Sequence, residues 1–71
     1  MNRTEILRLE KYLQEKFGNK KIAVMQRKET KDSLEVQLDG EFMGTIYRDE
    51  DEGEVSYDFN MAILDIDLPA A

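Results

Sequence analysis

The sequence predicts an α+β fold in which one N-terminal helix packs on an antiparallel sheet of about four strands. Apolar residues recur at spacings of three and four over residues 4–17, which is the period of an amphipathic helix. From residue 20 onward apolar and polar residues alternate, which is typical of strands with one buried face. Asp39-Gly40 between two such runs indicates a tight hairpin, because both central residues of a type I′ turn need positive φ. A chain of 71 residues is long enough for one domain, 1–71.

The helix is expected to span residues 4–17. Asn2 and Glu5 have the spacing of a capping box, with Thr4 as an alternative N-cap. Gly18 supplies the left-handed residue that commonly ends a helix. The apolar stripe consists of Ile6, Leu9, Leu13 and Phe17. The charged side chains expected on the solvent side are Glu5, Arg8, Lys11, Glu15 and Lys16. We expect the stripe to cover the apolar face of the sheet and to leave no cavity for chemistry.

Strands are expected at residues 20–28, 33–38, 41–47 and 54–61, with a turn at 29–32. The inward positions of the second and third runs are Leu34, Val36, Leu38, Phe42 and Ile46. Gly44 lies between two of these, so it marks either a bulge or a close approach of the helix. Residues 64–68 alternate again, which favours a strand, but for residues 62–68 a turn of helix or a swapped arm stays open. Pro69 would end any such element.

Composition removes several kinds of chemistry. The chain has no cysteine, which excludes disulfides, thiolate metal sites and a cysteine nucleophile, and no histidine, the commonest general base near neutral pH. It also has no glycine-rich phosphate loop and no nucleophile elbow, so we expect no enzyme and no cofactor. No apolar run approaches the ~20 residues that span a bilayer, and no signal-peptide pattern opens the chain. We therefore expect a cytoplasmic protein without a membrane partner.

Charge is distributed unevenly along the chain, whose net value is −6. Residues 1–31 hold nine of the ten basic residues and four acids, giving +5, and residues 32–71 hold one basic residue and twelve acids, giving −11. The two halves can neutralise each other within one fold or meet head to tail in a homodimer. Nucleic-acid binding is disfavoured, because the net charge is negative and no aromatic residue lies between Phe17 and Phe42 for base stacking.

The segment RDEDEGEV (48–55) is the most concentrated group of charges. Its acids are Asp49, Glu50, Asp51, Glu52 and Glu54, placed around Gly53. An EF-hand loop with Gly53 at its sixth position would have Arg48 at the first and Phe59 at the twelfth, so that motif fails. Three alternatives stay open: a solvated turn, a surface for a basic protein partner, or a weak calcium, magnesium or small-ligand site.

A second set of residues is expected on the surface although it is apolar. Leu7 and Tyr12 lie off the helix stripe, and Met43 and Tyr47 lie on the phase opposite the inward residues of their strand. Such residues can form a partner surface, and they favour a homodimer. Asp65 and Asp67 would share one face of a strand, but the sequence offers no substrate pocket for a carboxylate pair.

Three segments resemble a family of small bacterial proteins. They are KFGN (16–19), GEFMG (40–44) and FNMAILDIDL (59–68). The family is known mainly from alphaproteobacteria and is catalogued as a domain of unknown function. The resemblance implies a small α+β domain and carries no activity, cofactor or catalytic residue. We therefore expect a non-catalytic protein-interaction module that uses its acidic surface and a sheet edge, with a divalent-cation or small-ligand binding protein through the 49–54 carboxylates as the alternative.

Overall fold

A computed structural model describes residues 1–28 and 32–71. Within these ranges the chain forms the helix α1 (Arg3–Phe17), the strands β1 (Ile22–Gln26), β2 (Ser33–Leu38), β3 (Glu41–Asp51) and β4 (Glu54–Asn60), and the 3-10 turn η1 (Asp65–Asp67). The strands form one antiparallel sheet in the order β1-β2-β3-β4. The predicted fold class is confirmed, and the turn expected at 29–32 lies largely outside the described residues.

Both ends of α1 have the predicted caps. The Asn2 side chain accepts a hydrogen bond from the Glu5 N–H at 2.8 Å, and the Glu5 carboxylate accepts one from the Asn2 N–H at 3.3 Å. These two bonds make the capping box that satisfies backbone donors at the start of a helix. Gly18 ends the helix with φ of 62°, a left-handed conformation that glycine adopts without steric cost.

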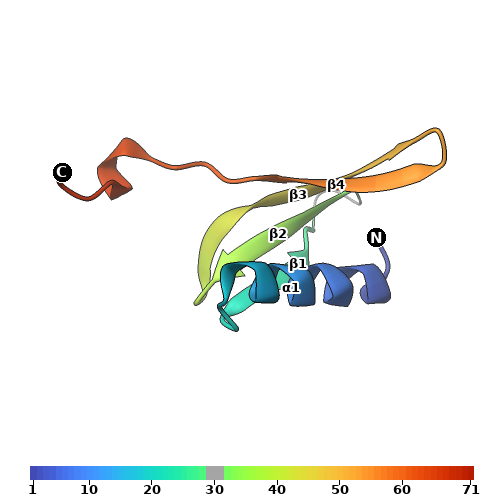
Figure 1. Ribbon diagram of the computed structural model, residues 1–71, viewed down its shortest axis with the longest axis horizontal. Coiled ribbons are helices and arrows are strands. Elements are labelled where there is room, and N and C mark those ends of the chain that lie inside the picture. The colour runs from blue at the N-terminus through green and yellow to red at the C-terminus, as the bar shows by residue number, and fades with distance from the viewer. Residues whose placement is uncertain (29–31) are drawn as a thin grey trace.

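The core lies between α1 and one face of the sheet. Its buried residues are Leu13, Ile22, Val24, Leu34, Val36 and Ile46. The helix lies against β1, while β4 runs along the far side of the sheet (Figure 1). One helix therefore covers the β1 side of this face well and the β4 side poorly. Phe17 shows the consequence, because its side chain is half exposed and meets the ring of Phe59 edge-on, with centroids 6.4 Å apart.

Two tight hairpins join β2 to β3 and β3 to β4. The central residues of the first, Asp39 and Gly40, have φ of 53° and 84°, and those of the second, Glu52 and Gly53, have φ of 51° and 82°. Positive φ at both positions is the geometry of a type I′ turn, as the Asp-Gly pair predicts. The third strand was expected to end at residue 47, which is wrong. β3 continues to Asp51, because β4 pairs with it as far as the turn.

A β-bulge in β3 reverses two predictions. Val36 pairs with Gly44 and Gln37 pairs with Phe42, so Met43 is the extra residue. Phe42 consequently lies on the outer face and is 61 % exposed, whereas the sequence predicts it inward. Met43, predicted to be exposed, is half buried against the core. The suspected bulge at Gly44 is confirmed, but the element close to this glycine is β4 rather than the helix.

The last eleven residues leave the sheet as an arm, which we define as residues 61–71. Every residue of the arm is exposed, and the arm extends from the end of β4 away from α1 (Figure 1). Of the alternatives left open for this segment, the strand that the alternation favours is wrong, and the helical turn is the one found, since Asp65–Asp67 form a 3-10 turn. No described strand pairs with the arm, and an isolated strand has no partner for its backbone hydrogen bonds.

Candidate functional site

The poorly covered side of the sheet contains an open groove between α1 and β4, which we call the helix–β4 groove. Its volume is about 610 Å³. Its apolar floor is made by Leu9, Tyr12, Leu13, Ile46, Tyr57 and Phe59, and its charged rim by Glu5, Arg8, Lys11 and Glu15. The helix stripe therefore does not cover the whole apolar face of the sheet, as was expected, and leaves this groove open. The reason is geometric, because a helix that packs against β1 cannot also close over β4.

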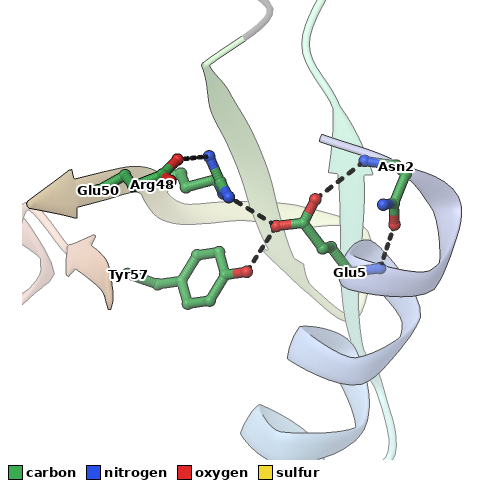
Figure 2. Close-up of polar contacts among 5 residues, drawn as sticks. All are labelled: Asn2, Glu5, Arg48, Glu50 and Tyr57. Carbon is green, nitrogen blue, oxygen red and sulfur yellow. Dashed lines mark hydrogen bonds and ion pairs between the residues drawn. The ribbon is translucent and has the colours of Figure 1, made fainter. Parts of the chain in front are cut away.

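One end of the groove is closed by a polar cluster that joins α1 to β3 and β4 (Figure 2). The hydroxyl of Tyr57 donates a 2.6 Å hydrogen bond to the Glu5 carboxylate, and Nε of Arg48 donates to the same oxygen at 3.1 Å. A second guanidinium nitrogen of Arg48 bonds to Glu50 at 3.1 Å. Arg48 and Tyr57 are cross-strand partners, so the register of the β3–β4 hairpin places both opposite the first turn of α1.

The cluster holds Glu5 in its ionised form. The hydrogen bond from Tyr57, the backbone N–H bonding within the capping box and the positive charge of Arg48 lower the pKa of Glu5 below its ordinary value. The same bond raises the pKa of Tyr57, since ionised Tyr57 would face a carboxylate and lose its proton donor. A carboxylate with two donors and a lowered pKa is a weak general base, so the cluster is suited to holding α1 and β4 in place.

The two edges of the sheet differ in how their backbone is covered. On β1, the Val24 N–H donates to the Glu10 carboxylate at 3.0 Å, and the Ile22 carbonyl accepts from the Gln14 side chain at 2.9 Å. Both helix side chains thus occupy backbone positions to which another strand would bind. β4 forms the opposite edge, and its inner side chains Tyr57 and Phe59 lie at the margin of the core and line the groove.

The predicted apolar surface residues do not form one patch. Tyr12 lines the groove and is 58 % exposed. Leu7 is exposed on α1 outside the groove lining, and Tyr47 is exposed on the outer face of the sheet. Met43 lies against the core. Sequence reasoning missed Tyr57 and Phe59 as site residues, although their alternation in the fourth strand shows more apolar surface than one helix can cover.

The predicted acidic residues are divided between the two faces of the β3–β4 hairpin. Glu50 lies on the inner face, where it bonds to Arg48, and Glu52 lies in the turn. Asp51 pairs directly with Glu54, and Asp49 lies two residues before Asp51 on the same face. Over residues 1–28 and 32–71 the structure shows no group of three or more acidic side chains gathered closely enough to hold a metal ion.

The fold and groove define a small α+β protein with one helix on an antiparallel meander, open along one edge of its sheet. The chain belongs to the family described as Protein of unknown function (DUF3126), whose model matches residues 5–67. The predicted family resemblance is thereby confirmed. Neither the curated proteins nor the solved structures gave a match to this chain. In the described part of the chain, no helix combines the length and the hydropathy needed to cross a membrane.

Proposed function

We propose that this protein is a non-catalytic interaction module that binds a protein partner along β4 and the helix–β4 groove. The observation that carries the proposal is the asymmetry of the two sheet edges. Glu10 and Gln14 cover the edge of β1, while the edge of β4 adjoins the apolar floor of the groove. An exposed edge beside an apolar groove can accept a further strand through backbone hydrogen bonds and side-chain contacts together.

The charges around this surface support a protein partner with a basic segment. The β3–β4 hairpin extends β4 beyond the groove and carries exposed Asp49, Asp51 and Glu54. These acids lie beyond the groove, so their negative potential attracts a basic segment to the hairpin end of β4. A non-catalytic role is supported by Glu5, whose lowered pKa and two donors leave it poorly suited to proton transfer.

A capture experiment with matched edge variants tests the proposal. Val55 in β4 and Met25 in β1 are both exposed apolar residues on edge strands. A lysine at either position adds the same charge, and lysine on an edge strand opposes pairing with another strand. Proteins captured from native cell extract by the wild type are expected to be lost with Val55→Lys and kept with Met25→Lys. Equal capture by both variants would contradict the proposal. Cytoplasmic residence is part of the same proposal, and cell fractionation tests it.

A further inference from the structure

The exposed arm has a pattern that fits the helix–β4 groove. Its large apolar side chains are all at least half exposed. They are Met61, Ile63, Leu64, Ile66 and Leu68, with Ile66 the most exposed at 87 %. The acids Asp65 and Asp67 alternate with Leu64, Ile66 and Leu68. An apolar segment of this kind is costly to leave in water, since each fully buried leucine or isoleucine side chain contributes roughly 1.5–3 kcal/mol.

The groove offers the complementary surface. Its floor is apolar, and Arg8 and Lys11 stand on the part of its rim between Glu5 and Glu15. Glu5 is already engaged by Arg48 and Tyr57, so its charge is offset within the molecule. The arm's leucine and isoleucine side chains would pack on the apolar floor. Its aspartates would lie beside Arg8 and Lys11.

The arm does not reach the groove of its own chain. It continues past the end of β4, away from α1, and the molecule measures 45 × 23 × 22 Å (Figure 1). The arm and the groove are both exposed, and on one chain they cannot meet. A second copy can bring each arm to the other copy's groove. Such an exchange is symmetric, so both arms and both grooves are used at once.

We infer that the protein is a homodimer in which residues 61–68 of each copy bind in the helix–β4 groove of the other. The inference rests on the proposed function, because it names the groove as the interaction surface and a second copy as its occupant. The two claims can fail separately. A monomeric protein would rule out the exchange of arms, while capture of another protein through β4 could still succeed.

Sedimentation equilibrium on the full-length chain is the first test. The wild type is expected at twice its 8.3 kDa mass at roughly 100 µM, in the range of ordinary micromolar association. Ile66→Asp is expected to raise the dimer dissociation constant at least about tenfold, because it places a charge in an apolar floor. Ile66 is so exposed that its replacement does not disturb the single chain. A wild type that remains a monomer at roughly millimolar concentration, or a dimer insensitive to Ile66→Asp, would overturn the inference.

Charge exchange tests which surfaces meet. The arm variant Asp65→Lys/Asp67→Lys and the groove variant Arg8→Glu/Lys11→Glu each bring like charges together, so each alone is expected to dimerise at least about tenfold more weakly. An equimolar mixture of the two is expected to restore a heterodimer, since each arm then meets a groove of opposite charge. Asp32→Lys/Glu35→Lys makes the same change in net charge at acids outside both surfaces and off β4, so this control should dimerise as the wild type does. Failure of the mixture to associate would refute the pairing of arm with groove.

Discussion

Tyr57 in β4 donates a 2.6 Å hydrogen bond to the carboxylate of Glu5 in the first turn of α1, which links residues 52 positions apart. Glu5 also completes the capping box with Asn2. One carboxylate thus caps the helix and fixes the distance between α1 and β4 at one end of the groove. α1 and β4 therefore meet through a polar contact at this end of the groove, and through the edge-on rings of Phe17 and Phe59 elsewhere.

Removing the Tyr57 hydroxyl is expected to change how stability depends on pH. The pKa of Glu5 in the folded protein lies below its ordinary value of 4.5, so its contribution to stability is present above that pH and is lost as pH falls through the lower folded value. Tyr57→Phe should raise the pKa of Glu5 and flatten the acid limb of the stability curve. Denaturant unfolding between pH 3 and pH 7, with an NMR titration of the Glu5 carboxyl, measures both. Tyr12→Phe, the same change elsewhere in the groove, should leave both unaltered.

Gly44 is expected to tolerate no side chain. A Cβ atom built there would lie 2.5 Å from the carbonyl oxygen of Asn60 and 2.6 Å from the ring of Phe59. Because the backbone carbonyl cannot rotate away, β4 would have to shift. Gly44→Ala should lower the free energy of unfolding by roughly 1–3 kcal/mol, the usual cost of overpacking. Urea denaturation measures it, and an unchanged midpoint would show that β4 does not approach β3 this closely.

The tip of the acidic hairpin is expected to gain stability from one reversed charge. Asp51 and Glu54 are direct cross-strand partners of like charge. Glu54→Lys turns this pair into an attractive one and should stabilise the fold by about 0.2–1 kcal/mol at low salt, less at high salt. Asp58→Lys makes the same change in net charge, but Asp58 lies opposite the uncharged Tyr47. It therefore distinguishes the interaction between residues 51 and 54 from the effect of net charge alone. Equal effects of the two variants would show that only net charge matters.

The covered edge of β1 is expected to depend on the Glu10 acceptor. Glu10→Ala removes the partner of the Val24 N–H and should cost roughly 1–3 kcal/mol, the range for an unsatisfied buried donor. Glu10→Gln keeps a carbonyl oxygen at the same position and should retain most of the stability. Thermal unfolding with hydrogen exchange at Val24 measures the difference. Equal loss with alanine and glutamine would indicate that the charge, and not the hydrogen bond, is what matters.

The carboxylates at 49–54 are expected to leave calcium and magnesium unbound. Alternation along β3 and β4 directs Glu50 inward to Arg48, and Asp49, Asp51 and Glu54 to the other face. Titrating either ion to millimolar concentration, against sodium at matched ionic strength, should not shift the backbone amides of this segment. A saturable shift would revive the ion-binding alternative.

The sequence predicts the elements whose causes are local. The capping box, Gly18 and the Asp39-Gly40 turn depend on neighbouring residues, and all three are confirmed. The prediction placed Phe42 inward because it assumed unbroken alternation. The extra residue Met43 reverses the phase of β3, and the alternation of β3 alone does not reveal such a bulge. The partnership of Glu5 with Tyr57 was missed because a charged residue on a helix is ordinarily expected in water.

Pairing with a neighbouring strand, which the local sequence does not show, decides both the length of β3 and the conformation of the arm. Acidic residues have low strand propensity, yet pairing with β4 keeps Arg48–Asp51 in a strand. Residues 64–68 have an alternating pattern, yet no described strand pairs with them, and Asp65–Asp67 form a 3-10 turn instead. The groove could be anticipated only in part, because one helix cannot cover the apolar face of a sheet this wide.

Site-specific photo-crosslinking tests most directly whether the helix–β4 groove is the binding surface. A photoreactive phenylalanine derivative at position 12 lies in the groove, and the same group at position 47 lies on the outer face of the sheet. Both positions hold exposed tyrosines, so the replacement is equally mild at each. We expect crosslinks from position 12, to a second copy or to another protein, and few from position 47. Crosslinks from position 47 alone would contradict the account and place the binding surface on the opposite face.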